Sequence, residues 1–145
     1  MLRMTRQADY GILMLAQMAR EPRGHVHSAR DLAVAAELPL PTASKILKAL
    51  ARARLLESQR GANGGYRLSR AAAAISVAEV ISALEGPIGV TECTAEGLEP
   101  CVHERNCLTR SPMHRINSAV RATLQKVSLA DVAGPGPHNR VSIAV

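Results

Sequence analysis

PTASKILKALARARLLESQRGANGGYRLSR, residues 41–70, is the stretch that decides the expected fold. Its first half repeats apolar residues at helical spacing on one face, namely Ala43, Ile46, Leu47 and Leu50. Basic residues recur on another face at i, i+3 and i+7, namely Lys45, Lys48 and Arg52. The second half starts apolar, turns at Asn63-Gly64 and ends in GYRLS, a pattern typical of a β-hairpin with a two-residue turn of positive φ. These residues predict a short basic helix followed directly by a hairpin.

A second helix and a stiff turn precede this stretch. Residues 28–37 read SARDLAVAAE, which favours a helix, and LPLP follows at residues 38–41. Pro41 suits the first position of the next helix, because its missing N–H has no partner there. Two helices joined by a tight turn are typical of a helix-turn-helix, and a hairpin directly after the second helix is a wing. An ordinary pair of antiparallel helices with a solvated basic face is the alternative, but it leaves the β-hairpin that follows unexplained.

Three more helices are expected around this motif. Residues 6–20 are apolar over much of a helix circumference, and residues 75–87 carry a capping box formed by Ser76 and Glu79. The last helix is expected over 112–132, where an apolar seam with polar flanks is typical of a helix that pairs with a partner. The seam consists of Met113, Ile116, Val120, Leu124 and Val127. The expected fold class is therefore mainly α with a small β-hairpin.

The chain divides into four predicted parts, which its 145 residues suit as one domain with an extension. Residues 1–86 form the winged helix-turn-helix DNA-binding domain, and residues 87–111 form a cysteine loop. Residues 112–132 form the long C-terminal dimerisation helix. Residues 133–145, AGPGPHNRVSIAV, show no period and are expected to be a flexible tail.

Composition narrows the classes of function. The formal net charge of +6 favours a polyanionic partner, with nucleic acid first. No apolar run approaches the roughly 20 residues that a membrane span needs, so a cytoplasmic protein without a membrane partner is expected. The sequence contains no G-x-S-x-G, no H-E-x-x-H and no dinucleotide fingerprint, so an enzyme is not expected.

Double-stranded DNA is the expected partner, and its candidate contacts are polar and basic residues of the predicted recognition helix and wing. They are Thr42, Ser44, Lys45, Lys48, Arg52 and Arg60. The first three lie at the start of the helix, where side chains reach base edges or phosphates. Lys48 and Arg52 would mainly meet the phosphate backbone, which gives affinity without sequence information. Arg60, at the base of the wing, is a candidate to enter a narrow minor groove.

All three cysteines of the chain lie in residues 91–107, TECTAEGLEPCVHERNC, with the spacing C-x7-C-x5-C. Cys93, Cys101 and Cys107 would supply soft thiolate ligands, which suit an iron–sulfur cluster. Structural zinc is an alternative, with His103 or His114 as a fourth ligand, although zinc sites usually contain a C-x2–4-C pair. A metal-free thiol switch and three unrelated thiols also remain open, because spacing alone does not separate these chemistries.

Several motifs together resemble one family. They are MLRMTRQADYGILML at residues 1–15, RGANGGYRL at 60–68, ISVAEVISALEGPIGVTEC at 75–93 and the three cysteines before the last helix. Over roughly residues 1–130, the chain resembles the IscR/NsrR family of winged-helix transcription regulators. Within that family it is most similar to the branch that regulates SUF-type iron–sulfur cluster assembly.

The resemblance implies a homodimeric DNA-binding regulator, most commonly a repressor, that senses iron–sulfur cluster status, redox state or nitric oxide. It implies an iron–sulfur cluster, 2Fe–2S favoured over 4Fe–4S, held by Cys93, Cys101 and Cys107. Asp9 matches the position from which some members supply a further ligand across the dimer. Arg110 stands where other members have a histidine ligand, and the first cysteine spacing is longer than the commonest family form. The resemblance also assigns Arg60 to DNA contact.

Overall fold

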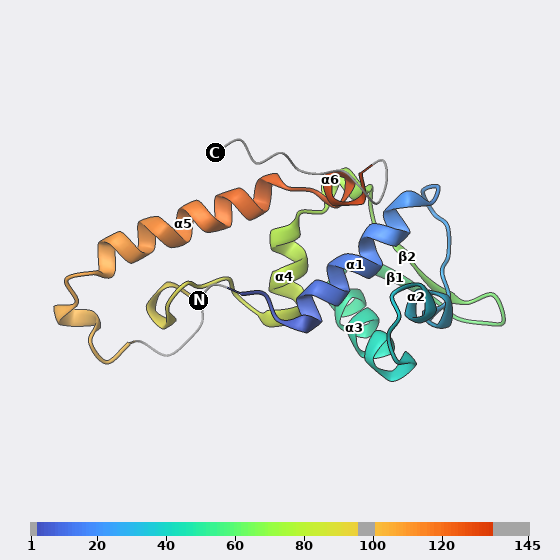
Figure 1. Cartoon of the computed structure of the whole chain (residues 1–145), viewed down its shortest axis with the longest axis horizontal. Helices are drawn as coiled ribbons and strands as arrows, with labels where there is room; N and C mark the ends of the chain where they lie inside the picture. The colour runs from blue at the N-terminus through green and yellow to red at the C-terminus, as the bar shows by residue number, and fades with distance from the viewer. Residues whose placement is uncertain (1–2, 96–100, 135–145) are drawn as a thin grey trace.

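The computed structural model describes residues 3–95 and 101–134. Predictions for the segment 96–100 and for most of the tail, from residue 135, lie outside the described residues. The elements in chain order are α1 (Arg6–Arg20), α2 (Ala29–Ala35), α3 (Leu40–Arg52), β1 (Leu56–Gln59), β2 (Gly65–Leu68), η1 (Ala72–Ala74), α4 (Val77–Glu85), η2 (Glu92–Thr94), η3 (Glu104–Asn106), α5 (Arg110–Lys126) and α6 (Leu129–Ala133). This mainly helical fold with one hairpin confirms the expected class (Figure 1).

Helix α1 lies at the centre of the body, between α6 on one side and α3 on the other (Figure 1). Its side chains Met14 and Leu15 are fully buried, and the inner face of α3 packs into the same core. Gly11 lets α4 approach α1 closely, because a Cβ at this position would lie 2.4 Å from Cδ1 of Leu84. Burial of these apolar surfaces is the main stabilising contribution to the fold.

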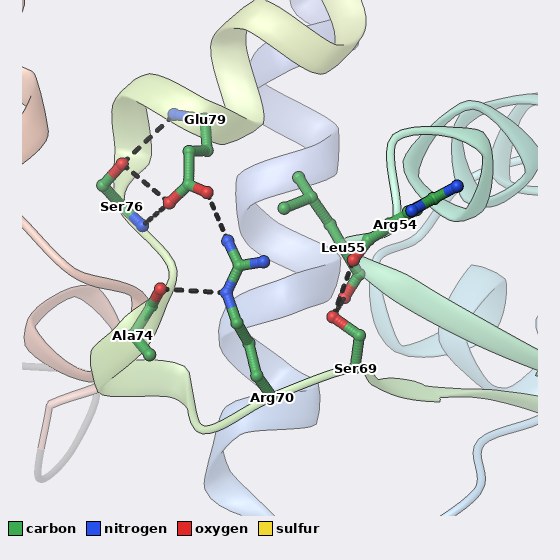
Figure 2. Close-up of polar contacts among 7 residues, drawn as sticks. All are labelled: Arg54, Leu55, Ser69, Arg70, Ala74, Ser76 and Glu79. Atoms are coloured by element: carbon green, nitrogen blue, oxygen red, sulfur yellow. Dashed lines mark hydrogen bonds and ion pairs between the residues drawn. The ribbon is translucent and has the colours of Figure 1, made fainter.

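The start of α4 is held by side-chain contacts that the sequence predicted. The backbone N–H of Glu79 donates to Ser76 Oγ at 3.3 Å, and the backbone N–H of Ser76 donates to Glu79 Oε2 at 2.9 Å, so the capping box is confirmed. Arg70 forms an ion pair with the same carboxylate and donates from Nε to the Ala74 carbonyl at 3.0 Å (Figure 2). These contacts connect the end of the wing to the start of α4.

The capping box also stabilises the charged form of the Glu79 carboxyl. Burial raises the pKa of this carboxyl, but the hydrogen bonds from Ser76 and the charge of Arg70 outweigh it and leave the pKa below its usual value. A carboxyl with a lowered folded-state pKa stabilises the fold above its unfolded pKa, and this contribution is lost as the pH falls through the folded pKa.

The wing is a two-stranded antiparallel hairpin in which Leu56 pairs with Leu68 and Gln59 with Gly65. The predicted two-residue Asn63-Gly64 turn is wrong. Five residues, 60–64, connect the strands, and Gly61 rather than Asn63 adopts positive φ, at 110°. The backbone N–H of Gly64 closes a turn onto the Gly61 carbonyl at 3.0 Å, which places Asn63 inside an ordinary turn.

The loop before α2 adds a further backbone pairing to the hairpin. His27 and Tyr66 exchange two N–H to carbonyl hydrogen bonds, each 2.8 Å long. Gly65 is required here, because a Cβ at this position would lie 2.1 Å from the His27 carbonyl oxygen. The wing is therefore fixed to the helix-turn-helix as well as to α4.

The segment 112–132 is not one helix, as the sequence predicted, but two. Helix α5 ends at Lys126, and Ser128 begins α6 with its own capping box. Residues on either side of the break pair with the chain before α4: Val77 donates to the Val127 carbonyl and Leu129 donates to the Ile75 carbonyl, both at 2.9 Å. The break allows Leu129 to pack, fully buried, in the main core. Burial of this side chain stabilises the fold more than continuation of α5 as an exposed helix would.

From this junction, helix α5 extends outward from the body as an arm, and the segment that directly precedes α5 in the chain, with η3, lies at its far end (Figure 1). Within residues 3–95 and 101–134, no helix combines the length and apolarity needed to cross a bilayer.

Candidate DNA interface and cysteine loop

Helix α3 presents the predicted basic face to solvent. Its apolar residues Ala43, Ile46, Leu47 and Leu50 are buried in the core. Because this face is buried, the opposite face of α3 lies toward solvent. Its exposed residues are Thr42, Lys45, Lys48 and Arg52, and Ser44 is half-buried. Helix N-termini leave backbone N–H groups available to phosphates, and here the cap residue Pro39 makes no side-chain cap hydrogen bond. The geometry thus fits the entry of α3 into a DNA groove.

Arg60 differs from the other arginines of the wing. Arg67 pairs across the strands with Glu57, with 2.7 Å between Nη2 and Oε2, and Arg70 pairs with Glu79. Arg60 lies directly after β1, is exposed, and has no hydrogen bond or ion pair to any residue that the structure describes. The sequence placed three arginines around the hairpin, but only the structure separates the two committed to the fold from the one available to a ligand.

The three cysteines lie on the connection between α4 and α5, and all three are free thiols of intermediate exposure. Cys93 is the middle residue of η2, and its sulfur lies 3.2 Å from the hydroxyl of Thr91. Cys107 lies two residues before Thr109, the N-cap of α5, and its sulfur lies 3.3 Å from the hydroxyl of Thr109. Each of these two thiols therefore has one hydroxyl neighbour from its own turn.

The surroundings of Cys107 favour its thiolate form. The hydroxyl of Thr109, the backbone N–H groups of Thr109 and Arg110, and the charge of Arg110 together lower the pKa of the Cys107 thiol. The thiolate is both the metal ligand and the nucleophile of cysteine, so a lowered pKa favours both roles at this position. Its place at the start of a helix follows the common pattern for such cysteines.

Sequence reasoning missed Asn117, one of two buried polar residues in the described part of the core. Its side chain is only 5 % exposed and contacts the cysteine loop: Val90 donates its N–H to Asn117 Oδ1 at 3.1 Å, and Asn117 Nδ2 donates to the Thr94 carbonyl at 3.2 Å. A signal was present, because Asn117 follows Met113 by four residues and so falls on the apolar seam. A polar residue on an apolar face indicates a specific partner.

The described residues do not contain a preformed metal centre within one chain. Across residues 3–95 and 101–134, no three His, Cys, Asp or Glu side chains lie close enough to hold a metal ion. Asp9 is exposed in the first turn of α1. The assignment of Cys93, Cys101, Cys107 and Asp9 to one cluster therefore stays a prediction. The donor set itself fits an iron–sulfur cluster, because it offers three free, partly exposed thiols on one loop.

Comparisons with known proteins agree with this architecture. The Rrf2 family model, described as an iron-dependent transcriptional regulator, matches residues 4–135. The HTH-type transcriptional regulator Rv1287 of Mycobacterium tuberculosis is 33 % identical over 133 residues, which cover 92 % of this chain and 82 % of that protein.

Two solved structures share the fold. CymR (YrzC), the global cysteine regulator of B. subtilis, superposes with a TM-score of 0.73 at 30 % identity, covering 92 % of this chain and 97 % of that one. IscR of T. potens superposes with a TM-score of 0.68 at 25 % identity, covering 90 % and 85 % of the two chains. These relatives are regulators and not enzymes, as the sequence predicted. With the family model spanning residues 4–135 and the same winged-helix fold in its solved relatives, this chain belongs to the Rrf2 family of transcriptional regulators.

Proposed function

We propose that this Rrf2 regulator is a homodimeric repressor that reads operator DNA with α3 and the wing, and that an iron–sulfur cluster on its cysteine loop controls this binding. The observation that carries the proposal is that all three cysteines are free, partly exposed and located on the connection between α4 and the outlying helix α5. The proposed signal is cluster supply, redox state or nitric oxide. The proposed regulatory target is SUF-type iron–sulfur assembly, as in the branch that the sequence resembles.

Cys93, Cys101 and Cys107 would hold the cluster, and a bound cluster would supply a redox-active, oxygen- and nitric-oxide-sensitive centre. The lowered pKa of Cys107 favours its thiolate, which is the form that ligates iron. Three thiolates leave one position of a four-ligand site open, and Asp9 of the partner subunit is the proposed fourth ligand. A carboxylate is a harder ligand than a thiolate, so this contact would be the most labile. The proposed cluster is 2Fe–2S, the type that the family resemblance implies.

A continuous set of contacts connects the cysteine loop to the DNA-reading elements. The loop continues into α5, and residues 127–129 beyond α5 pair with residues 75–77 at the start of α4. Helix α4 packs against α1 and α3, the recognition helix. A change in the order of the loop would therefore alter how α3 is held in each subunit. Half-site spacing tolerates little change in the separation of two recognition helices, so small shifts would affect affinity.

Anaerobic purification tests the proposal directly. The expected product is coloured, contains iron and acid-labile sulfide, and binds operator DNA with an affinity that changes when the cluster is removed. The chain has two Tyr and no Trp, so its own near-ultraviolet absorbance is weak and a cluster chromophore stands out. Colourless protein with stoichiometric zinc would indicate the structural zinc alternative, and metal-free protein would contradict the cluster.

A metal-free thiol switch is the second candidate function, because the lowered pKa of Cys107 also favours attack of its thiolate on a peroxide-type oxidant. The oxidant would be reduced as the sulfur becomes a sulfenic acid, which would condense with a second cysteine thiol to form a disulfide and release water. CymR, the global cysteine regulator of B. subtilis, shares this fold. The switch predicts an oxidised form with a disulfide between two of the three cysteines. Mass mapping of the air-oxidised protein detects this disulfide. Loss of a cluster, in contrast, releases iron into solution.

Operator binding should depend steeply on salt and on the basic residues of α3 and the wing. We expect Lys48→Ala to weaken all DNA sequences alike and to reduce the slope of log K against log salt by about one. The double variant Lys45→Ala, Arg60→Ala should also change the preference among A·T-rich sites. Lys126→Ala, which removes an exposed charge at the C-terminal end of α5, is the matched control. Unchanged DNA affinity in the double variant, measured by fluorescence anisotropy, would contradict the assignment of both α3 and the wing.

A further inference from the structure

The buried side chain of Asn117 connects α5 to the turn that carries Cys93. Its Oδ1 accepts from the Val90 N–H on one side of Cys93, and its Nδ2 donates to the Thr94 carbonyl on the other side. Asn117 and Thr94 are each 5 % exposed, so these two bonds lie away from water. A pair of buried bonds that brackets one residue fixes the position of that residue strongly.

The bracketed turn is itself a rigid unit. The backbone N–H of Thr91 donates to Thr94 Oγ1 at 3.0 Å, and that hydroxyl donates back to the Thr91 carbonyl at 2.9 Å. The sulfur of Cys93 lies against the second hydroxyl of the turn, on Thr91. Gly89 allows the chain to close on itself, because a Cβ there would lie 2.4 Å from Cβ of Ala95. The turn from Thr91 to Thr94 therefore moves as one piece, and Asn117 is its attachment to α5.

This attachment places two thiols relative to a single helix. Cys107 is joined covalently to the first turn of α5, and Cys93 is joined through Asn117, seven residues into the helix from Arg110. At the rise of an α-helix, these two anchoring points are roughly 10 Å apart along the axis. We infer that Asn117 is a positioning residue that holds Cys93 on α5 as a ligand platform shared with Cys107. The cluster part of this inference rests on the proposed function.

The inference predicts a specific change in the metal-free protein. In reduced apoprotein, Asn117→Leu should increase the alkylation rate of Cys93 by iodoacetamide about tenfold, because the loss of both bonds releases the turn. The rate of Cys107 should change less than about twofold, because its hydroxyl and N–H neighbours belong to its own turn. Gln125→Leu is the matched control, since it makes the same amide-to-leucine change at an exposed position of the same helix. Rates are measured for each cysteine by peptide mass mapping, with circular dichroism confirming the fold.

A second measurement uses the anaerobically prepared protein. We expect Asn117→Leu to shift the visible spectrum and to shorten the lifetime of the chromophore in air, while Gln125→Leu matches the wild type. An unchanged Cys93 alkylation rate overturns the role of Asn117, whatever the metal content. Suppose that Cys93 is alkylated faster in Asn117→Leu but the anaerobically prepared wild type contains no iron. This result overturns the cluster proposal alone and supports the placement of Cys93 by Asn117.

Discussion

Replacement of Cys93, Cys101 and Cys107 together by alanine should abolish the iron chromophore and make operator affinity independent of iron supply. The chain has only three cysteines, so no other thiolate can substitute for a missing one. Each single Cys→Ala variant should therefore also lose the chromophore. Loss of a residue that only orients a metal ligand commonly costs about 10- to 100-fold in metal affinity or activity, so loss of a ligand itself should cost at least about 100-fold.

The control for the cysteine variants is Val102→Ala, a change of similar size at a side chain in the same loop that is 92 % exposed. Asp9→Ala should keep part of the chromophore but release iron faster, because a carboxylate is the weakest of the proposed ligands. Iron and sulfide are measured per chain, and operator affinity is measured before and after chelation. A triple variant that binds like the wild type, together with an anaerobic wild type free of iron and sulfide, would leave a regulator with no cluster sensor.

The sequence predicted the fold well wherever one periodic signal agreed with local chemistry. The apolar residues of α3 are buried and its basic residues are exposed, because one face of an amphipathic helix must enter the core. The capping box of Ser76 and Glu79 formed as expected, since it depends only on residues three positions apart. The Rrf2 family comparison also confirms the resemblance that several motifs had indicated together.

Errors arose where distant contacts decide local structure. The wing turn was assigned from Asn63-Gly64, but the five-residue loop follows from Gly61 at positive φ and from the approach of His27 to Gly65. The last helix was expected to continue through Val127, but pairing with residues 75–77 ends it there. Neither contact leaves a periodic pattern, because each joins segments separated by long stretches of chain. The same reason explains why Asn117 was missed, since its partners precede it by more than twenty residues.

Charge placed on the apolar seam of α5 should convert the protein to monomers and nearly abolish operator binding. Helix α5 extends away from the body (Figure 1), and its seam residue Ile116 is 44 % exposed in the single chain, while Met113 and Val120 are partly exposed. Exposed apolar side chains in a row on an outlying helix favour burial against a second copy, as in a coiled coil. This motivates the proposed homodimer, in which the two α5 helices pair and each subunit contributes one recognition helix.

The structure decides which seam residues make a clean test. Leu124 already packs against a small cluster of its own chain, formed by Ala8, Val77 and Ile81, so a charge at this position would damage the monomer. Ile116 and Val120 lie farther out along the helix. The test is therefore the double variant Ile116→Glu, Val120→Glu. Ala122→Glu adds a charge to the exposed opposite face of the same helix and serves as the control.

Sedimentation equilibrium should show monomer for the double variant and dimer for the wild type and for Ala122→Glu. In the dimer, binding of one subunit to its half-site raises the effective concentration of the other subunit at the second half-site. Separate monomers lose this advantage, so operator affinity should fall by about 10²- to 10⁴-fold. The far-ultraviolet circular dichroism should be unchanged, because the altered side chains lie outside the main core. A wild type that sediments as monomer would contradict the pairing role of α5. A double variant that remains dimeric would place the subunit contact on another surface, and DNA affinity would then be expected to stay close to that of the wild type.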